Sequence, residues 1–219
     1  YRPMDISGSA LRESAARLVE EFPGLRIEAL IADFMKQIDH FGESRGRRLF
    51  CFFGSTLGNL LPGQQEDFFE ELSGAMSPGD RLLLGVDMVK DRSVVEKAYN
   101  DDSGVTSEFN LHILDVVNRI AGTDFDPAAF RHLAFYDEAH ERIEMHLEAI
   151  EDQTVSSPHL GESILIRRGE RIRTEYSHKF TQRAVTRLFE RAGIEVEERF
   201  TDGEGWFSLY CGLRGGEPR

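Results

Sequence analysis

The stretch LFCFFGSTLGN, residues 49–59, is an unbroken apolar run that breaks into two glycines and small polar residues. An apolar run this short, rich in Phe and bounded by Gly, predicts a strand buried on both faces of a parallel sheet. Ligands of such sheets bind in a crevice beyond the carboxyl ends of the strands, so a site is expected at residues 54–59. Taken alone, the stretch is equally compatible with an ordinary strand-to-helix turn.

Hydrophobic periodicity around this stretch predicts that strands and helices alternate in the first part of the chain. The predicted strands are 27–31, 49–53 and 81–89. A helix that begins after Ser7 or Ser9 precedes the first of them, and another begins near Gln64. Such alternation forces parallel pairing through right-handed crossovers, which predicts an α/β layered sheet.

The last part of the chain predicts one more helix and a hairpin. A helix capped by Thr181 ends at Gly193, and strands follow at 194–200 and 206–213. Their short connection makes these two strands antiparallel neighbours. A parallel α/β sheet that ends in an antiparallel hairpin resembles the arrangement of class I methyltransferases.

The middle of the chain has a different pattern. Residues 91–135 are predicted to be helical, with Leu114, Val117 and Ala121 in register and Thr106 as a cap. From residue 143 the period changes to two, and a second alternating stretch covers 164–180. We interpret these stretches as antiparallel strands of an insertion beside the sheet.

Composition limits the partners of this 219-residue chain. The formal net charge of −13 makes a nucleic-acid backbone an unsuitable partner, because phosphate binding needs a basic face. Cys51 and Cys211 lack metal-ligand spacing and are expected to be buried, which fits a reducing cytoplasm. No apolar run approaches the roughly 20 residues of a membrane-spanning helix, so no membrane partner is expected.

Three common catalytic motifs fail. The sequence His140-Glu141-Arg142-Ile143-Glu144 lacks the second histidine of a zinc protease helix, and no metal site is predicted. The stretch 54–58 has Thr where the serine of a nucleophile elbow would stand. The absence of a G-x-G-x-x-G between a strand and a helix disfavours a nicotinamide-dependent oxidoreductase.

Two pairs of polar residues have informative positions. Asp5 and Asp33 each end a predicted strand, where a carboxylate can accept hydrogen bonds from ribose hydroxyls or an adenine amino group. Glu175 and Ser177 lie two residues apart on an alternating strand and therefore project to the same side. The alternatives are helix N-terminal aspartates in the first case and a solvated strand face in the second.

Together these stretches closely resemble the histidine-specific Nα-methyltransferases of ergothioneine biosynthesis. The enzymes of this family use S-adenosylmethionine to convert L-histidine to its trimethylammonium betaine, hercynine. The resemblance covers essentially the whole chain. It is carried by FGSTLGN at 53–59, AYND at 98–101, GVT at 104–106, FN at 109–110, IEM at 143–145 and TEYSHKF at 174–180.

The resemblance implies roles for individual residues. Asp5 matches the residue that holds the cofactor ribose, Asp33 and Phe34 match those that contact the adenine, and Gly54 lies in the cofactor crevice. Asn59 and Tyr99 look like the groups that orient the substrate amine and carboxylate. The remaining substrate-binding set is Phe109, which lines the pocket, and the imidazole-recognition residues Met145, Glu175 and Ser177.

The resemblance also implies a division of the chain. Residues 1–90 and 181–219 match a Rossmann-like cofactor-binding domain, and 91–180 match a small α+β substrate-binding insertion. The family carries further sequence ahead of the position of Tyr1, with its first strand and Gly-rich cofactor loop. We therefore expect the chain to be a fragment that alone neither binds S-adenosylmethionine tightly nor turns over.

Three alternatives remain open from the sequence. The enzyme expected with its amino-terminal part restored is a monomer that acts on the small molecule L-histidine. A related N-methyltransferase of other aromatic amino acids is the first alternative, although Met145 and Glu175 argue for histidine. A catalytically inactive fragment that only binds ligand is the second, and the disfavoured oxidoreductase is the third.

Overall fold

A computed structural model of the chain describes residues 1–42, 46–159, 161 and 163–216. Its largest sheet has the strand order β10-β11-β4-β3, with β3 (Leu49–Phe52) parallel to β4 (Arg81–Asp87). The final hairpin, β10 (Ile194–Thr201) and β11 (Phe207–Arg214), is antiparallel and joins the sheet through β4. The predicted parallel sheet with an antiparallel terminal hairpin is therefore confirmed.

Two helices cover one face of this sheet. Helix α2 (Pro62–Ala75) and helix α5 (Gln182–Arg191) pack on the side chains of alternate strand residues. Thr181 caps α5 as predicted, because its hydroxyl accepts a hydrogen bond from the Ala184 amide. The cluster under the two helices includes Leu82, Leu84, Phe69, Phe189 and Tyr210, all of which are essentially inaccessible to solvent.

The opposite face of the sheet differs from the sequence prediction. Leu49 is 57% exposed and Cys51 is also exposed, while Cys211 is partly exposed on the same side. The prediction that strand 49–53 is buried on both faces and that both cysteines are buried is therefore wrong for the described residues. The physical reason is that α2 and α5 both pack against one side.

The first part of the chain forms a parallel pair of very short strands. Helix α1 (Gly8–Glu21), capped by Ser7, one of the two predicted caps, connects β1 (Met4–Asp5) to β2 (Leu30–Ile31). The predicted strand 27–31 is thus shorter than expected, because hydrogen bonding in a two-stranded pair extends only as far as its partner. A 3-10 turn, η1 (Ile38–Phe41), then leads toward β3 and packs on α2.

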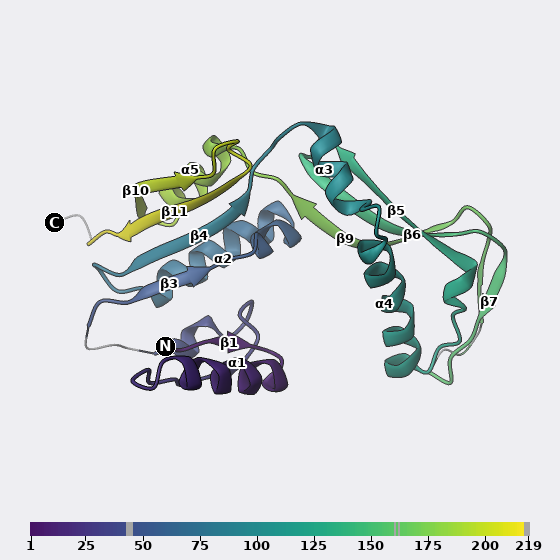
Figure 1. The fold of residues 1–219 in the computed structure, drawn as a ribbon, viewed down its shortest axis with the longest axis horizontal. Helices are drawn as coiled ribbons and strands as arrows, with labels where there is room; N and C mark the ends of the chain where they lie inside the picture. Colours follow the sequence, from purple (N-terminus) through teal and green to yellow (C-terminus); the bar gives the residue numbers. More distant parts are fainter. Residues whose placement is uncertain (43–45, 160, 162, 217–219) are drawn as a thin grey trace.

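A second group of elements lies beyond β4 (Figure 1). Helices α3 (Arg92–Tyr99) and α4 (Val105–Ala121) precede the antiparallel sheet β5-β6-β9, made of β5 (Phe130–Asp137), β6 (Arg142–Ala149) and β9 (Arg171–His178). The short turn η3 (Pro127–Ala129) precedes β5, and the small hairpin β7 (Gln153–Val155) and β8 (Ile164–Ile166) completes the group. The predicted antiparallel strands are confirmed, and their assignment to a separate insertion stays a prediction.

Two details of this group correct the sequence prediction. Residues 130–135 belong to strand β5 rather than to the predicted helical stretch 91–135. Thr106 does not cap α4: Gly104 occupies the cap position, and the Asp101 carboxylate accepts hydrogen bonds from the Val105 and Thr106 amides. Hydrogen bonds from the Ser103 and Thr106 hydroxyls, together with these amide bonds, hold the pKa of Asp101 well below its usual range.

The group leaves and rejoins the main sheet at one point. Met88 forms a parallel bridge with Phe180, the Phe180 amide donates to the Asp87 carbonyl at 2.8 Å, and the Val89 amide donates to the Phe180 carbonyl at 3.0 Å. The segment just after β4 and the segment just after β9 therefore lie side by side (Figure 1). This junction places the second group against the carboxyl ends of β3 and β4.

Candidate active site

A pocket of about 350 Å³ lies where the carboxyl ends of β3 and β4 meet α3 and β9. This is the edge of a parallel sheet at which ligands bind. Five of the predicted site residues, Gly54, Asn59, Tyr99, Glu175 and Ser177, line it together, although they come from four separate elements or turns. The other lining residues are Ser55, Thr56, Asp87, Lys179 and Phe207.

The turn after β3 forms the floor of this pocket. Gly54 and Ser55 both have left-handed backbone conformations, with φ of 75° and 57°. Glycine tolerates this conformation freely, whereas Ser55 is held in it by hydrogen bonds. The Ser55 amide donates to the Gly85 carbonyl at 3.2 Å, and its hydroxyl accepts from the Asp87 amide at 2.9 Å. The sharp turn leads into η2 (Thr56–Asn59), which ends on the exposed Asn59.

The wall of the pocket is a hydrogen-bonded cluster of three side chains. The Tyr99 hydroxyl lies 2.7 Å from Ser177 Oγ, and Lys179 Nζ lies 2.9 Å from each of these two oxygens. Lys179 also forms an ion pair of 2.9 Å with the Asp87 carboxylate. The ammonium lies 4.8 Å from the centre of the Tyr99 ring, within the range of a cation–π contact. These contacts fix the position of the Tyr99 and Ser177 hydroxyls.

Glu175 lies on the same side of β9 as Ser177, as the alternation predicts. Burial raises the pKa of the Glu175 carboxyl, and the positive charge of Lys179 opposes that rise. The pocket therefore holds a desolvated carboxyl group next to a hydroxyl. Such a pair can accept a hydrogen bond and exchange another with one small polar ligand.

Two predicted substrate-binding residues lie away from the lining of this pocket. Met145 is 2% exposed and belongs to a core cluster with Val95 and Ile143, against which Tyr99 packs. Phe109 is 61% exposed on α4. The structure thus places Met145 behind the pocket wall and Phe109 outside it, and their binding roles stay predictions.

Three of the four predicted cofactor residues, Asp5, Asp33 and Phe34, lie at or just after the ends of β1 and β2, whereas Gly54 lies after β3. The Ala32 amide donates to the Asp5 carbonyl at 3.1 Å, so Asp5 and Asp33 follow adjacent strands. The Asp5 carboxylate accepts from the Ser7 amide at 2.7 Å, and that of Asp33 accepts from the Met35 amide at 2.9 Å. This last bond is the main cause of a lowered pKa for Asp33, which keeps that group ionised. Phe34 packs against the main core, with its ring 5.3 Å from that of Phe52 on β3 and 5.9 Å from that of Phe68 on α2.

Sequence reasoning missed two residues of the site, Lys179 and Asp87. Lys179 follows Ser177 by two positions, so the same alternation that grouped Glu175 with Ser177 could have included it. Asp87 is a strand-end carboxylate, like Asp5 and Asp33. Both therefore had a signal in the sequence.

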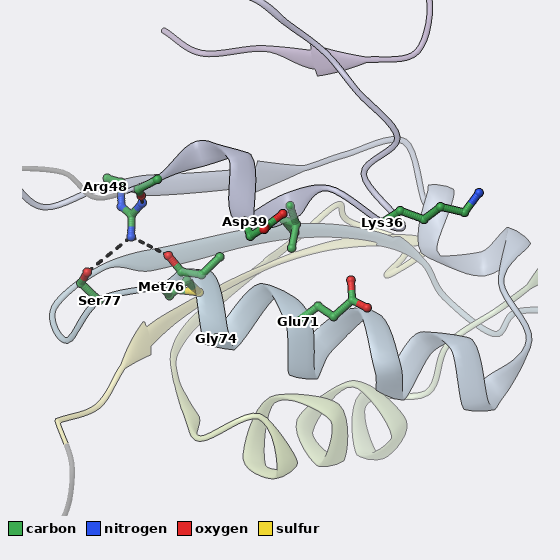
Figure 2. Close-up of a pocket in the computed structure, with 10 residues that line it drawn as sticks. Lys36, Asp39, Arg48, Glu71, Gly74, Met76 and Ser77 are labelled. Atoms are coloured by element: carbon green, nitrogen blue, oxygen red, sulfur yellow. Dashed lines mark hydrogen bonds between the residues drawn. The ribbon is translucent and has the colours of Figure 1, made fainter.

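A larger pocket of about 600 Å³ lies at the opposite end of β3 and β4, where these strands begin. Figure 2 shows that Arg48 points from the start of β3 toward Ser77 and the end of α2, away from the carboxyl ends of the strands. Arg48 also pairs with the buried Asp80 at 2.8 Å. These contacts join the two strand starts to α2, so we interpret this pocket as structural.

Two further features bear on the kind of site. Among the described residues, His, Cys, Asp and Glu side chains form no group of three or more that could hold a metal ion. In the same residues, no helix is both long and apolar enough to cross a membrane.

Comparison with known proteins agrees with this geometry. Residues 1–213 match the sequence model of a family described as histidine-specific methyltransferase, SAM-dependent. The chain is 42% identical over 209 residues to histidine N-alpha-methyltransferase of Mycobacterium tuberculosis (strain CDC 1551 / Oshkosh), covering 95% of this chain and 65% of that protein. It is 40% identical over 216 residues to histidine N-alpha-methyltransferase of Mycolicibacterium smegmatis (strain ATCC 700084 / mc(2)155), covering 98% and 66%. The chain thus spans slightly less than two thirds of the length of these relatives.

A solved structure supports the fold. The CcbJ methyltransferase from Streptomyces caelestis superimposes with a TM-score of 0.52 over 98% of this chain and 74% of that chain, at 14% sequence identity. The expected class I methyltransferase fold is therefore confirmed. The expectation of S-adenosylmethionine as cofactor is confirmed at the level of the family, whose description includes this dependence.

Proposed function

Because the chain belongs to the histidine-specific, S-adenosylmethionine-dependent methyltransferase family, we propose that its protein methylates the α-amine of L-histidine. The product is N,N,N-trimethylhistidine, which is hercynine, formed in the first step of ergothioneine biosynthesis. The observation that carries this proposal is the pocket at the carboxyl ends of β3 and β4. There the carboxyl of Glu175 and the hydroxyl of Ser177 adjoin Tyr99 and Asn59.

The residues of the pocket suit methyl transfer to an amine. The reaction is an in-line displacement that requires a neutral amine held close to the methyl group, and orientation alone can supply roughly 7–11 kcal/mol. In this proposal Asn59 and Tyr99 hold the amine and carboxylate of the substrate. Neither a covalent intermediate nor a nucleophilic side chain is needed, which fits a lining of amide, hydroxyl and carboxyl groups.

The residues on the cofactor side suit S-adenosylmethionine. Carboxylates at the ends of adjacent parallel strands, Asp5 and Asp33, are acceptors for ribose hydroxyls and an adenine amino group. The left-handed turn at Gly54 leaves the backbone open to a ligand at the end of β3. When bound, S-adenosylmethionine supplies the electrophilic methyl group.

Glu175 and Ser177 provide the selectivity in this proposal. A substrate ring that cannot hydrogen-bond would leave the half-buried carboxyl of Glu175 without a partner, which disfavours binding. We therefore favour histidine over the other aromatic amino acids. The non-catalytic alternative has no specific observation in its favour, since Asn59, Tyr99, Glu175 and Ser177 of the family pattern line one pocket.

We also propose a division of labour within the protein. Residues 1–90 and 181–219 would bind the cofactor, and 91–180 would supply most of the groups that recognise the amino acid. In this proposal the enzyme is a cytoplasmic monomer that acts on a small-molecule substrate, without nucleic acid or membrane partners. The formal net charge of −13 is what disfavours a nucleic-acid partner.

The test is mass spectrometry of reactions containing S-adenosylmethionine and one amino acid. The protein expressed from its own gene is incubated with histidine, tryptophan or tyrosine, and we expect stepwise addition of three methyl groups to histidine only. Equal or greater methylation of tryptophan or tyrosine would reject histidine as the substrate. No methylation of any of them, by protein that is folded, would reject the enzymatic proposal.

A further inference from the structure

Lys179 is a buried ammonium whose three hydrogens are all in use. Its side chain is only 1% exposed. An ammonium has three donors and no acceptor, and Lys179 Nζ lies 2.9 Å from each of three oxygens, on Asp87, Tyr99 and Ser177. Lys179 can therefore only donate to the two hydroxyls, and it has no hydrogen left for a ligand.

This arrangement sets the direction of the remaining hydrogen bonds. A phenol is a stronger donor than an alkyl hydroxyl, so across the 2.7 Å contact Tyr99 donates its proton to Ser177. Ser177 Oγ then accepts from both Lys179 and Tyr99, which occupies both of its lone pairs. Its own proton has no acceptor in this cluster and points to the pocket that Ser177 lines.

We propose that Lys179 is a positioning residue that makes Ser177 a hydrogen-bond donor to the substrate, opposite the acceptor Glu175. One donor and one acceptor on the same strand face match a ring that has one N–H and one nitrogen lone pair. A neutral imidazole has this pattern. The inference rests on the proposed function for the identity of the ring, and it assigns the selectivity for that ring to a residue that does not touch it.

An alternative is that Lys179 only neutralises Asp87. The chain offers a matched control, because Lys90 forms an ion pair with the same carboxylate. The contacts of Lys90 are with Asp87 and the face of the Trp206 ring, and neither Tyr99 nor Ser177 is among them. Lys90→Met and Lys179→Met thus each remove one ammonium from Asp87, but only the second frees a lone pair of Ser177.

The experiment measures binding by calorimetry, with histidine and with 3-(2-thienyl)alanine, whose ring has neither N–H nor a basic nitrogen. We define the preference as the affinity for histidine divided by the affinity for 3-(2-thienyl)alanine. This preference should fall about fivefold to tenfold in Lys179→Met, which is the usual effect of one lost hydrogen bond. Lys90→Met should keep the preference of the parent protein. Lys179→Leu, which likewise has no hydrogen-bond donor, is the second variant and should show the same loss as Lys179→Met.

A double-mutant cycle identifies the route of the effect. In a Ser177→Ala background, Lys179→Met should change the preference no further, because the hydroxyl on which Lys179 acts is gone. An equal loss of affinity for both ligands, or the same fall in preference with and without Ser177, would overturn the proposal. If the parent protein prefers histidine in binding but does not methylate it, the proposed function fails while this inference stands.

Discussion

Gly58 and His178 hold the turn after β3 against the end of β9 through direct backbone contact. His178 Nδ1 donates to the Gly58 carbonyl at 2.8 Å, and a Cβ added to Gly58 would lie 2.6 Å from the His178 carbonyl oxygen. A side chain at this position cannot fit without moving backbone. The contact therefore fixes the distance between Asn59 on one side and Glu175 and Ser177 on the other.

Gly58→Ala should both destabilise the protein and weaken histidine binding. Forcing one methyl group against the backbone typically costs about 1–3 kcal/mol, and here the displacement opens the pocket. Thermal unfolding and calorimetric titration with histidine measure the two effects. Gly63→Ala is the control, because a Cβ on Gly63 would meet no atom within 4 Å. Unchanged histidine affinity in Gly58→Ala would mean that the contact does not set the pocket geometry.

Stability should fall as the pH drops below about 6.5, the ordinary pKa of histidine. Burial is the main cause that lowers the pKa of His178, and the hydrogen bond to Gly58 only partly opposes it. Between the two pKa values the unfolded chain binds a proton that the folded protein excludes, so acid favours unfolding there. Denaturant unfolding at pH 5 to 8 measures this slope. In His178→Gln the free energy of unfolding should change less with pH. An identical pH dependence would mean that groups other than His178 cause it.

Glu175→Gln should weaken histidine binding by about 1–3 kcal/mol, because the charged acceptor for the ring is lost. The same change should stabilise the unliganded protein at neutral pH. Burial raises the pKa of Glu175, so ionisation is harder in the folded state and the charged form opposes folding once the pH exceeds the unfolded pKa of about 4.3. The stabilisation should therefore disappear as the pH falls below that value. Paired titrations and unfolding curves at pH 3.5 and 7 measure both effects, and a destabilised variant at pH 7 would contradict the assignment.

Arg48→Met should reduce stability by about 3–5 kcal/mol without changing the selectivity for histidine, because it leaves a buried carboxylate without its charged partner. Arg48 Nε lies 2.8 Å from the Asp80 carboxylate, and Asp80 is only 1% exposed. Burial would raise the pKa of Asp80, but hydrogen bonds from the Ser77 and Arg48 amides and from the Arg48 side chain together lower it. Chemical denaturation measures the loss of stability, and titrations with histidine and other amino acids measure the selectivity. Altered selectivity would show that the larger pocket is not merely structural.

The sequence predicted the elements with strong periodicity and missed those decided by tertiary contact. Ser7 and Thr181 cap their helices as expected, since N-capping depends on a local hydroxyl. The sequence pattern places residues 130–135 of β5 in a helical stretch, because it does not reveal the tertiary pairing of β5 with β6. The exposure of Cys51 was also missed, since an apolar composition alone does not say which face a helix covers.

In the site, too, local patterns could be predicted from the sequence and tertiary contacts could not. Glu175 and Ser177 were grouped by strand alternation, a local property. The convergence of Asn59, Tyr99 and Glu175 in one pocket came only from family resemblance, because no pattern in the sequence measures the distance between a turn and a remote strand. Lys179 shares the alternation, but its role depends on the hydroxyls of Ser177 and Tyr99, and the distances that define it exist only in the fold.

The bridge between Met88 and Phe180 brings the two ends of the intervening segment together. The bonds that close this junction join main-chain atoms of Asp87, Val89 and Phe180, so they do not depend on which side chains the segment carries. Its two ends start and finish at one place, and loop-closure entropy changes only slowly with the number of residues enclosed. A lineage could therefore exchange most of this segment for one with another binding surface, provided that His178 and Lys179 keep their contacts with Gly58 and Asp87. Under the proposed division of labour, the range of substrates would then change by replacement of this segment, separately from cofactor binding.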